Sequence, residues 1–376
     1  MVIYTIGGCV RDILLGLSPR DLDYVVVGGS HEEMIALNFT KVGADFPVYL
    51  HPDTRDEYAL ARTETKHGVG YLGFDVVTHD VSLAEDQSRR DLTINQLAVR
   101  IEDWDMFVKT KDEMLVLDAF NGIQDLKDKI LRHNTVAFRC DPVRILRTAR
   151  FAARYNFSVH PDTIELMRKV LPELDTIPQE RIWAEFEKGL MEKYPSRMFD
   201  VLTDCDTFGR AGPMVLKPYK YADFGKLSQV CDKHDITVRF ALINSGFVGD
   251  DYKTCRIPSD CASVGFTFNL VYAELQSYPK LSTNARLALL MQLKAFSHPW
   301  LLVKCLEVFS VYDVVSDGYT VEDVIACILG DLEAISTVSG ADIAATCTTG
   351  KDIGRKIFEA RVQIMDDYMV KKLARV

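Results

Sequence analysis

The chain has 376 residues, of which 48% are hydrophobic and 26% are charged, a composition typical of a folded globular protein. This length exceeds that of one ordinary domain and predicts at least two. No stretch approaches the roughly 18 apolar residues of a membrane span. The formal net charge of −10 argues, by itself, against a nucleic-acid-binding protein, although a whole-chain sum can conceal a local basic surface.

The N-terminus and the cysteines both predict a cytoplasmic protein. The first eight residues lack a basic segment and a cleavage site, and they predict a strand that runs into a turn. Nine cysteines are scattered without a C-x-x-C pair, which favours unreactive thiols over a zinc site.

The first part of the chain predicts a mixed α/β domain. Short apolar or β-branched runs predict strands at residues 3–6, 24–27, 57–62, 75–81 and 114–117. A helix is expected over residues 10–17, because apolar residues recur there at helical spacing and Pro19 follows. Residues 66–73 contain three glycines and predict a mobile loop.

From about residue 140 onward the apolar spacing is helical. Helices are expected at residues 141–155, 161–171, 179–192, 195–203, 284–296, 299–312, 320–335 and 351–372. Residues 205–265 contain prolines, glycines and weaker periodicity, and their elements stay unassigned. The prediction is an α+β protein with an α/β head over residues 1–137, a helical neck over 138–205, and a helical body and tail over 206–376.

The first group of chemistry-bearing residues follows the first strand. Gly7 and Gly8 form a turn whose N–H groups lie at a helix start, a suitable cradle for phosphate oxygens. Arg11, one turn later, can add a charge-assisted contact to a triphosphate. Asp21 and Asp23 stand one residue apart at the mouth of a strand, so their carboxylates share one face. Such a pair suits two Mg²⁺ ions that activate an attacking hydroxyl and stabilise a leaving pyrophosphate.

Solvated aspartates would be the better interpretation of a lone Asp-x-Asp, but the glycine turn and Arg11 upstream favour catalysis. Glu57 opens another expected strand and could complete the metal site as a third carboxylate. A surface glutamate is an equal alternative for Glu57.

A second group contains Arg89, Arg90, Asp91 and Asn95. Adjacent arginines before an apolar segment can bind phosphates or sugars, and Asp91 or Asn95 could fix a ribose or a backbone turn. A helix start capped by Asp91, with two solvated arginines, explains the composition equally well.

A third group lies in the helix expected from residue 141, with Asp141 as its N-cap and Pro142 in its first turn. At about 100° per residue its apolar side chains gather on one face. The opposite face carries arginines at positions 144, 147, 150 and 154 and no lysine. A solvated face is the alternative, but arginine is preferred where planar contacts to phosphates or base edges are needed.

Asp141 and Arg144 also suggest how a nucleotide could be chosen. Cytosine and adenine both present an amino donor beside a ring-nitrogen acceptor, which a carboxylate and a guanidinium match. Uracil and guanine present the opposite pattern and would leave buried groups unpaired. The hypothesis is that this pair accepts C and A; exchanging its polarity without changing nucleotide choice would refute it.

Five segments in order resemble the motifs of the class II CCA-adding tRNA nucleotidyltransferases, members of the polymerase β-like superfamily. They occupy residues 7–16 with Asp21 and Asp23, then 89–95, 118–132, 141–154 and 177–183. Residues 46–52 and 58–64 resemble the gammaproteobacterial branch. The resemblance implies a polymerase β-like head and template-independent addition of CCA to tRNA from CTP and ATP, with Mg²⁺ as cofactor.

The resemblance also assigns roles. Asp21 and Asp23 would hold the metal ions, and Asp141 with Arg144 would read the base. The residues expected at the incoming nucleotide are Gly7, Gly8, Arg11, Arg90, Asp91, Asp141, Arg144 and Arg147. The helical remainder would grip the acceptor stem and elbow of tRNA by shape and backbone.

The sequence departs from the family pattern in two places. Cys140 stands where the base-reading motif has a glutamate, so a supporting carboxylate is missing. Asn244 and Ser245 stand where the gammaproteobacterial branch has the His-Asp of a phosphohydrolase domain, and the nearby His234-Asp235 is an isolated dipeptide. A degenerate HD region without phosphohydrolase activity is expected.

Three other functions are alternatives to CCA addition. An enzyme that adds only A or only CC, or a poly(A) polymerase, shares these motifs, and the loop at residues 66–73 favours full CCA addition. A non-catalytic tRNA-binding relic has no need of Asp21, Asp23 and Arg11. A dinucleotide-dependent oxidoreductase is excluded, because the glycine turn lacks the G-x-G-x-x-G spacing.

Overall fold

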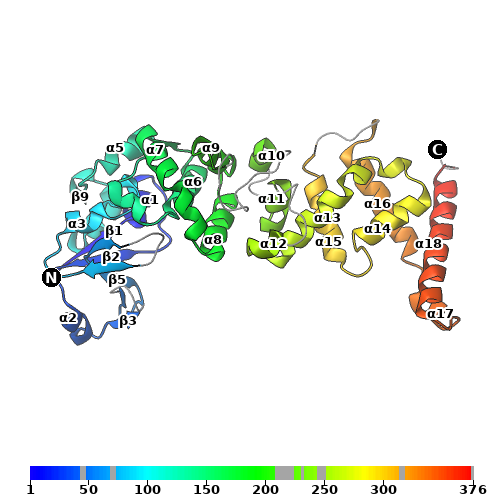
Figure 1. The fold of residues 1–376 in the computed structure, drawn as a ribbon, viewed down its shortest axis with the longest axis horizontal. Coiled ribbons are helices and arrows are strands. Elements are labelled where there is room, and N and C mark those ends of the chain that lie inside the picture. Colours follow the sequence, from blue (N-terminus) through cyan, green and yellow to red (C-terminus); the bar gives the residue numbers. More distant parts are fainter. Residues whose placement is uncertain are drawn as a thin grey trace. The chain divides into compact units, whose positions relative to one another are not determined.

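The computed structural model describes residues 1–42, 48–67, 73–207, 224–229, 233–243, 251–312 and 318–373. The chain divides into two compact units, Met1–Lys217 and Pro218–Val376. The first contains a sheet with helices packed around it, and the described part of the second is helical (Figure 1). This architecture confirms the predicted α+β class. Within the described ranges, no helix is both long and apolar enough to cross a membrane.

The first unit is built on a seven-stranded sheet with the order β3-β4-β5-β2-β1-β8-β9. Its strands are β1 (Val2–Ile6), β2 (Asp23–Val27), β3 (Thr40–Val42), β4 (Val48–Leu50), β5 (Glu57–Leu60), β8 (Ala98–Arg100) and β9 (Val116–Leu117). β1 runs antiparallel to β2 and β8, whereas β2 and β5 are parallel. The strands predicted near residues 3, 24 and 57 are thereby confirmed, because their β-branched and aromatic side chains suit a buried pleated surface.

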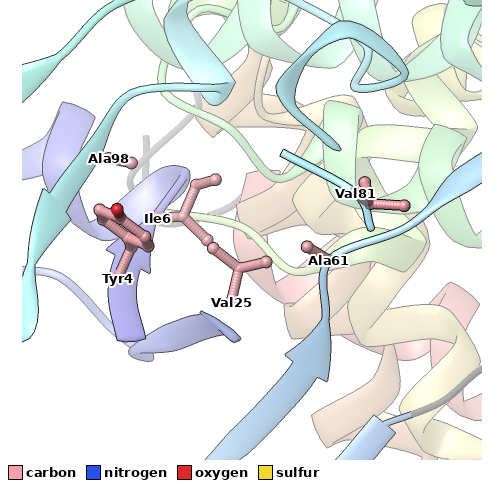
Figure 2. Close-up of a cluster of buried hydrophobic side chains, with 6 residues drawn as sticks. All are labelled: Tyr4, Ile6, Val25, Ala61, Val81 and Ala98. Carbon is pink, nitrogen blue, oxygen red and sulfur yellow. The ribbon is translucent and has the colours of Figure 1, made fainter. Parts of the chain in front are cut away.

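Both faces of the sheet are buried. On one face Tyr4, Ile6, Val25, Ala61, Val81 and Ala98 form a core cluster (Figure 2). On another, β2 contributes Tyr24 and Val26 to a cluster with Met34 and Tyr58. Alternate residues of a strand point to opposite faces, which is why neighbouring residues of β2 enter different clusters. This packing fixes the strand ends from which the candidate site is built.

A hairpin of β6 (Thr63–Lys66) and β7 (Phe74–Val77) carries the glycine-rich segment predicted as a loop. Residues 68–72 of that segment lie outside the described residues. β7 ends at Val77 rather than at residue 81, since the turn that follows places Asp80 in the left-handed region with φ of 55°.

The helices of the first unit pack around the sheet and follow it. They are α1 (Gly8–Leu14), α2 (His31–Ala36), α3 (Leu83–Ser88), α4 (Trp104–Thr110), α5 (Gly122–Asp128), α6 (Arg144–Tyr155), α7 (Pro161–Val170), α8 (Gln179–Leu190) and α9 (Ser196–Asp204). α7, α8 and α9 match their predicted ranges within two residues.

α6 begins at Arg144, so the prediction that Asp141 is its N-cap is wrong. Asp141 instead accepts a hydrogen bond from the Val143 N–H, 3.1 Å, in the turn before the helix.

The helices of the second unit are α10 (Phe224–Gln229), α11 (Ile236–Ile243), α12 (Asp251–Thr254), α13 (Ser259–Gln276), α14 (Thr283–Gln292), α15 (Pro299–Phe309), α16 (Val321–Ile335), α17 (Gly340–Ala344) and α18 (Gly350–Leu373). α13 begins in the unassigned stretch and continues beyond it to Gln276, where no helix was predicted, because apolar residues such as Phe266 and Leu270 also lie on its exposed side and weaken the periodicity. Asp235 caps α11 through the Thr237 and Val238 N–H groups and pairs with Lys304 at 2.8 Å. The His234-Asp235 dipeptide therefore has a structural role here.

Candidate nucleotidyl-transfer site

A cleft of about 720 Å³ opens in the first unit beside the C-terminal end of β1. Its wall combines the β1–α1 turn, the start of β2, the segment after α3, and α6 and α8. The predicted site residues that line it are Gly7, Gly8, Arg11, Asp21, Asp23, Arg90, Asp91, Asp141, Arg144 and Arg147. Glu57 does not line this cleft. Residues far apart in the sequence therefore meet at one place.

The turn between β1 and α1 needs glycine at its first position. Gly7 has φ of 89°, and a Cβ there would lie 3.4 Å from the carbonyl oxygen of Asn95. Its N–H donates to the Leu97 carbonyl at 2.8 Å. Because Thr5 of β1 pairs with Tyr24 of β2 in antiparallel register, this turn lies beside the segment that carries the two aspartates.

Arg11 is held in a fixed position at the cleft wall. The residue is only 4% exposed, and its Nε and Nη2 donate to Asp12 at 2.9 and 2.8 Å. Nη1 donates to the side-chain oxygen of Asn95. The rings of Phe151 and Tyr155 lie about 5 Å from the guanidinium, at 5.2 and 5.0 Å. Its contact with a triphosphate stays a prediction, but the charge is already oriented.

Asp21 and Asp23 present exposed carboxylates to the cleft. Desolvation raises the pKa of Asp23, Arg90 lowers it, and the neighbouring charges of Glu57 and Asp21 raise it further, so that the balance is upward. These couplings show that the acidic side chains lie near one another. Parallel pairing of β2 and β5 sets Asp23 directly opposite Glu57.

Glu57 nevertheless lies on a second, smaller cleft, of about 210 Å³, which shares Asp23 with the first. In the part of the chain that the structure describes, no group of three or more His, Cys, Asp or Glu side chains is arranged to hold a metal ion. Two carboxylates are enough for Mg²⁺, which takes oxygen ligands and commonly combines one or two carboxylates with substrate phosphates. Asp21 and Asp23 fit that requirement, whereas a role for Glu57 stays a prediction.

Arg89 and Arg90 follow the C-terminal end of α3 and do not start a helix. The alternative of a helix capped by Asp91 is therefore wrong. Arg90 donates through Nε and Nη2 to Oδ2 of Asp86 at 3.2 and 2.9 Å, and Arg89 donates to Oδ1 of the same carboxylate. The two arginines are thus fixed by one buried acid.

Asp91 lines the cleft but is almost completely buried and bound by its neighbours, and its contact with a nucleotide stays a prediction. Its Oδ1 accepts from the Leu92 N–H at 2.9 Å and from Asn95 Nδ2 at 3.0 Å, and its Oδ2 accepts from Arg147 Nε at 2.9 Å. Burial would raise the pKa of Asp91, but the Arg147 and Arg144 guanidinium groups outweigh it and hold the pKa well below its usual range. The side chain is therefore an anion within the cleft wall at neutral pH.

The arginine face of α6 turns toward the cleft, and the alternative of a solvated face is wrong. Its charges are balanced from inside the protein. Arg150 Nε donates to Glu185 of α8 at 2.7 Å, and Arg147 Nη1 lies 3.9 Å from the same carboxylate. Arg154 Nη2 lies 3.4 Å from Asp12. The predicted basic surface exists as an ordered wall of paired arginines.

Asp141 and Arg144 both line the cleft but are bound to different partners. Asp141 Oδ2 accepts from Arg181 Nη2 at 2.8 Å. Arg144 donates through Nη1 to the Ala137 carbonyl at 3.0 Å and through Nη2 to the Arg89 carbonyl at 2.7 Å. These bonds leave lone pairs on the carboxylate and further N–H groups on the guanidinium, so base recognition by the pair stays a prediction.

The sequence did not single out Asp12, Asp86 or Glu185 as parts of the site. All are less than 10% exposed, at 4%, 0% and 8%, and each binds one or more arginines of the cleft. The arginine-only face of α6 was a signal that buried acids must exist, because a buried charge needs a partner. The pairing of Glu185 with Arg150 depends on a tertiary contact, whereas Asp86 stands three and four residues before its arginines, a helical spacing that could have indicated it.

Two expectations fall wholly or partly outside the described residues. Asn244 and Ser245, the positions of the expected HD degeneration, are not described, nor are residues 68–72. Cys140 is described and is half-buried, at the end of a short 3₁₀ turn, Val136–Cys140.

The chain is similar in sequence to two protein-family models and to known proteins. A family model described as the poly A polymerase head domain matches residues 3–132, and one described as a probable RNA and SrmB-binding site of polymerase A matches residues 156–213. The multifunctional CCA protein of Dechloromonas aromatica (strain RCB) is 38% identical over 98% of this chain and 98% of its own length.

Other matches are shorter or concern the fold. The multifunctional CCA protein of Paraburkholderia phymatum is 52% identical over 222 residues, which cover 57% of this chain; in this match the chain spans about half, 51%, of that protein. The Thermotoga maritima CCA-adding enzyme in complex with tRNA has a similar fold, with a TM-score of 0.64 at 20% identity over 98% of this chain and 91% of that one.

Proposed function

Because the chain belongs to the family of CCA-adding tRNA nucleotidyltransferases, we propose that it adds or repairs the CCA 3′ end of tRNA from CTP and ATP. The observation that carries the proposal is the meeting of a glycine turn, two aspartates and an arginine wall in one cleft. Those are the parts that a nucleotidyl transfer needs: a phosphate cradle, metal ligands and positive charge for a pyrophosphate.

Asp21 and Asp23 are the residues that would hold Mg²⁺. When bound, the metal would favour ionisation of the attacking hydroxyl and stabilise charge on the departing pyrophosphate. Both carboxylates line the cleft together with the glycine turn and Arg90, which supports this assignment. The carboxylates must be ionised to bind a cation, so protons compete with Mg²⁺ for the site.

The remaining residues bind and orient the substrates. The Gly7–Gly8 turn, Arg11 and Arg90 would bind the triphosphate, while Arg144 and Asp141, which line the same cleft, would bind the base. The 3′ hydroxyl of the RNA attacks the α-phosphorus, the bond to pyrophosphate breaks, and the chain is extended by one nucleotide. No nucleic-acid template enters this scheme.

The RNA partner is tRNA, bound through its 3′ end, acceptor stem and elbow. The helical second unit would bind by shape and backbone contacts, the mode expected for structured RNA. We also infer that the second unit has no phosphohydrolase activity, because Asn244 and Ser245 occupy the positions of an expected His-Asp pair.

The test is an extension assay with Mg²⁺ and a tRNA that lacks its CCA end. CTP, ATP, UTP and GTP are supplied singly, and then CTP is combined with ATP. The expected result is two C additions followed by one A, abolished by Asp21→Ala. Asp105→Ala, an exposed aspartate on α4 outside the cleft, serves as the matched control and should add nucleotides like the wild type.

The other outcomes are distinct. Extension by A alone or by CC alone would identify the narrower enzymes of the family. A wild-type protein that binds tRNA and extends nothing would refute catalysis altogether.

A further inference from the structure

Asp86, in the last turn of α3, is a completely buried carboxylate that neither cleft includes in its wall. A buried charge without partners would be strongly unfavourable. Its Oδ1 accepts from the Arg62 backbone N–H at 3.2 Å and from Arg89 at 3.1 and 2.6 Å, and its Oδ2 accepts from Arg90 at 3.2 and 2.9 Å. Two guanidinium groups thus converge on one acid from opposite sides.

The two arginines differ in what else holds them. Arg89 also donates to Glu64 at 3.0 Å and to the Arg62 carbonyl at 3.1 Å. The Arg90 guanidinium donates to Asp86 through both Nε and Nη2. With those two nitrogens held by one carboxylate oxygen, the planar group has a single orientation.

That orientation directs the third nitrogen of Arg90 into the cleft. Arg90 Nη1 lies 3.7 Å from the point where a Cβ on Gly7 would stand, so it borders the glycine turn. Arg90 also acts electrostatically on Asp23 and lines the cleft with it. A cation at this place, between a phosphate cradle and a metal-binding carboxylate, suits the β- and γ-phosphates of a nucleotide.

We propose that Asp86 is a positioning residue that clamps Arg90 so that its Nη1 is presented to the triphosphate of the incoming nucleotide. The inference rests on the proposed function, because it assigns a purpose to the same cleft. Asp86 itself touches no substrate. Its effect passes through Arg90. Loss of Asp86 should therefore weaken the binding of nucleoside triphosphates and leave the binding of nucleosides unchanged.

The test measures binding of CTP and of cytidine to the full chain in magnesium buffer, without tRNA so that no turnover occurs. We expect Asp86→Ala and Arg90→Ala each to weaken CTP binding by roughly 10- to 100-fold, the range of a lost charge-assisted contact, and to leave cytidine binding unchanged. The CTP affinity of Asp86→Asn should lie between those of the wild type and Asp86→Ala, because the single amide oxygen can accept from only one of the two guanidinium groups. In the Arg90→Ala background, Asp86→Asn should cause no further loss for CTP.

Asp125→Ala is the matched control. Asp125 is another buried acid of the first unit, which accepts from Thr93 and Arg132 and lies outside the cleft wall. It should lower the unfolding temperature with unchanged CTP affinity. If Asp86→Ala fails to fold, the proposal is still tested by Asp86→Asn alone and by Asp86→Asn combined with Arg90→Ala.

Wild-type CTP affinity in both Asp86 variants, equal losses for CTP and cytidine, or additive losses with Arg90→Ala would overturn the inference. A wild type that binds CTP in this Arg90-dependent way but extends no tRNA would refute the proposed function and leave the clamp standing. If the wild type extends tRNA normally and the Asp86 variants keep wild-type CTP affinity, the proposed function stands and the role of Asp86 is refuted.

Discussion

Replacing Asp91 with asparagine tests the buried network behind the cleft. Asparagine can keep one oxygen as the acceptor for the Leu92 N–H, but its amide N–H₂ then faces the Nε of Arg147, where a carboxylate oxygen now accepts at 2.9 Å. A charge-assisted hydrogen bond is replaced by two opposed donors. Such a bond contributes about 1.5–3 kcal/mol.

The magnitude belongs toward the low end of that range. The Arg147 side chain is 36% exposed, so water can solvate its guanidinium after the change. We expect Asp91→Asn to lower the free energy of unfolding by about 2 kcal/mol. For a unit of this size that corresponds to a fall of roughly 4–8 °C in the unfolding temperature.

The pH dependence gives an independent check. The pKa of Asp91 is lowered in the folded protein, so its stabilisation is fully present above the unfolded value of about 3.9 and is lost as pH falls below it toward the folded pKa. Urea unfolding of both proteins should show the full difference at pH 7 and a narrowing one below about pH 4. Equal stability at pH 7, or a difference that stays constant down to pH 3, would refute the reasoning.

Two further outcomes follow from the same structure. A Cβ at Gly122 would lie 2.2 Å from the Thr93 carbonyl oxygen, so Gly122→Ala should cost roughly 1–3 kcal/mol in urea unfolding. Gly354→Ala, with open space around it in α18, should be neutral or stabilising, and equal effects of the two would contradict the steric argument. The affinity for Mg²⁺ should begin to fall at a pH above the ordinary aspartate pKa, because burial raises the pKa of Asp23 in the metal-free site, and Glu57→Gln should move that fall to lower pH; an unmoved profile would exclude Asp23 as the titrating group.

The sequence predicted the elements whose signals are local. β1 and β2 followed from short β-branched runs, and α7 to α9 from apolar spacing with nearby prolines. α13 was not predicted because its exposed side also carries large apolar residues, Phe266 and Leu270, which hide the helical period of its buried face. The start of α6 was placed too early, since Asp141 forms a turn of its own before the helix begins.

The glycine turn and Asp21 with Asp23 could be located from the sequence, because the residues that form this part of the site lie close together along the chain. The carboxylates that order the arginines of α6 could not. Glu185 meets Arg150 across 35 positions and Asp12 meets Arg154 across 142, so only the fold decides these pairings. Asp86 binds Arg89 and Arg90 at helical spacing, a local signal that the sequence analysis did not use.

These pairings change how the net charge of −10 should be interpreted. The arginine wall of the cleft is not a reserve of free positive charge, since Asp91 and Glu185 already bind Arg147 and Arg150. A polyanion entering the cleft must share each guanidinium with an internal carboxylate, which weakens its attraction but removes the entropy cost of ordering long side chains. The wall therefore favours a ligand whose phosphates match fixed N–H directions over one that offers charge alone. A protein with a negative net charge can in this way present an ordered, arginine-lined cleft to a phosphate ligand.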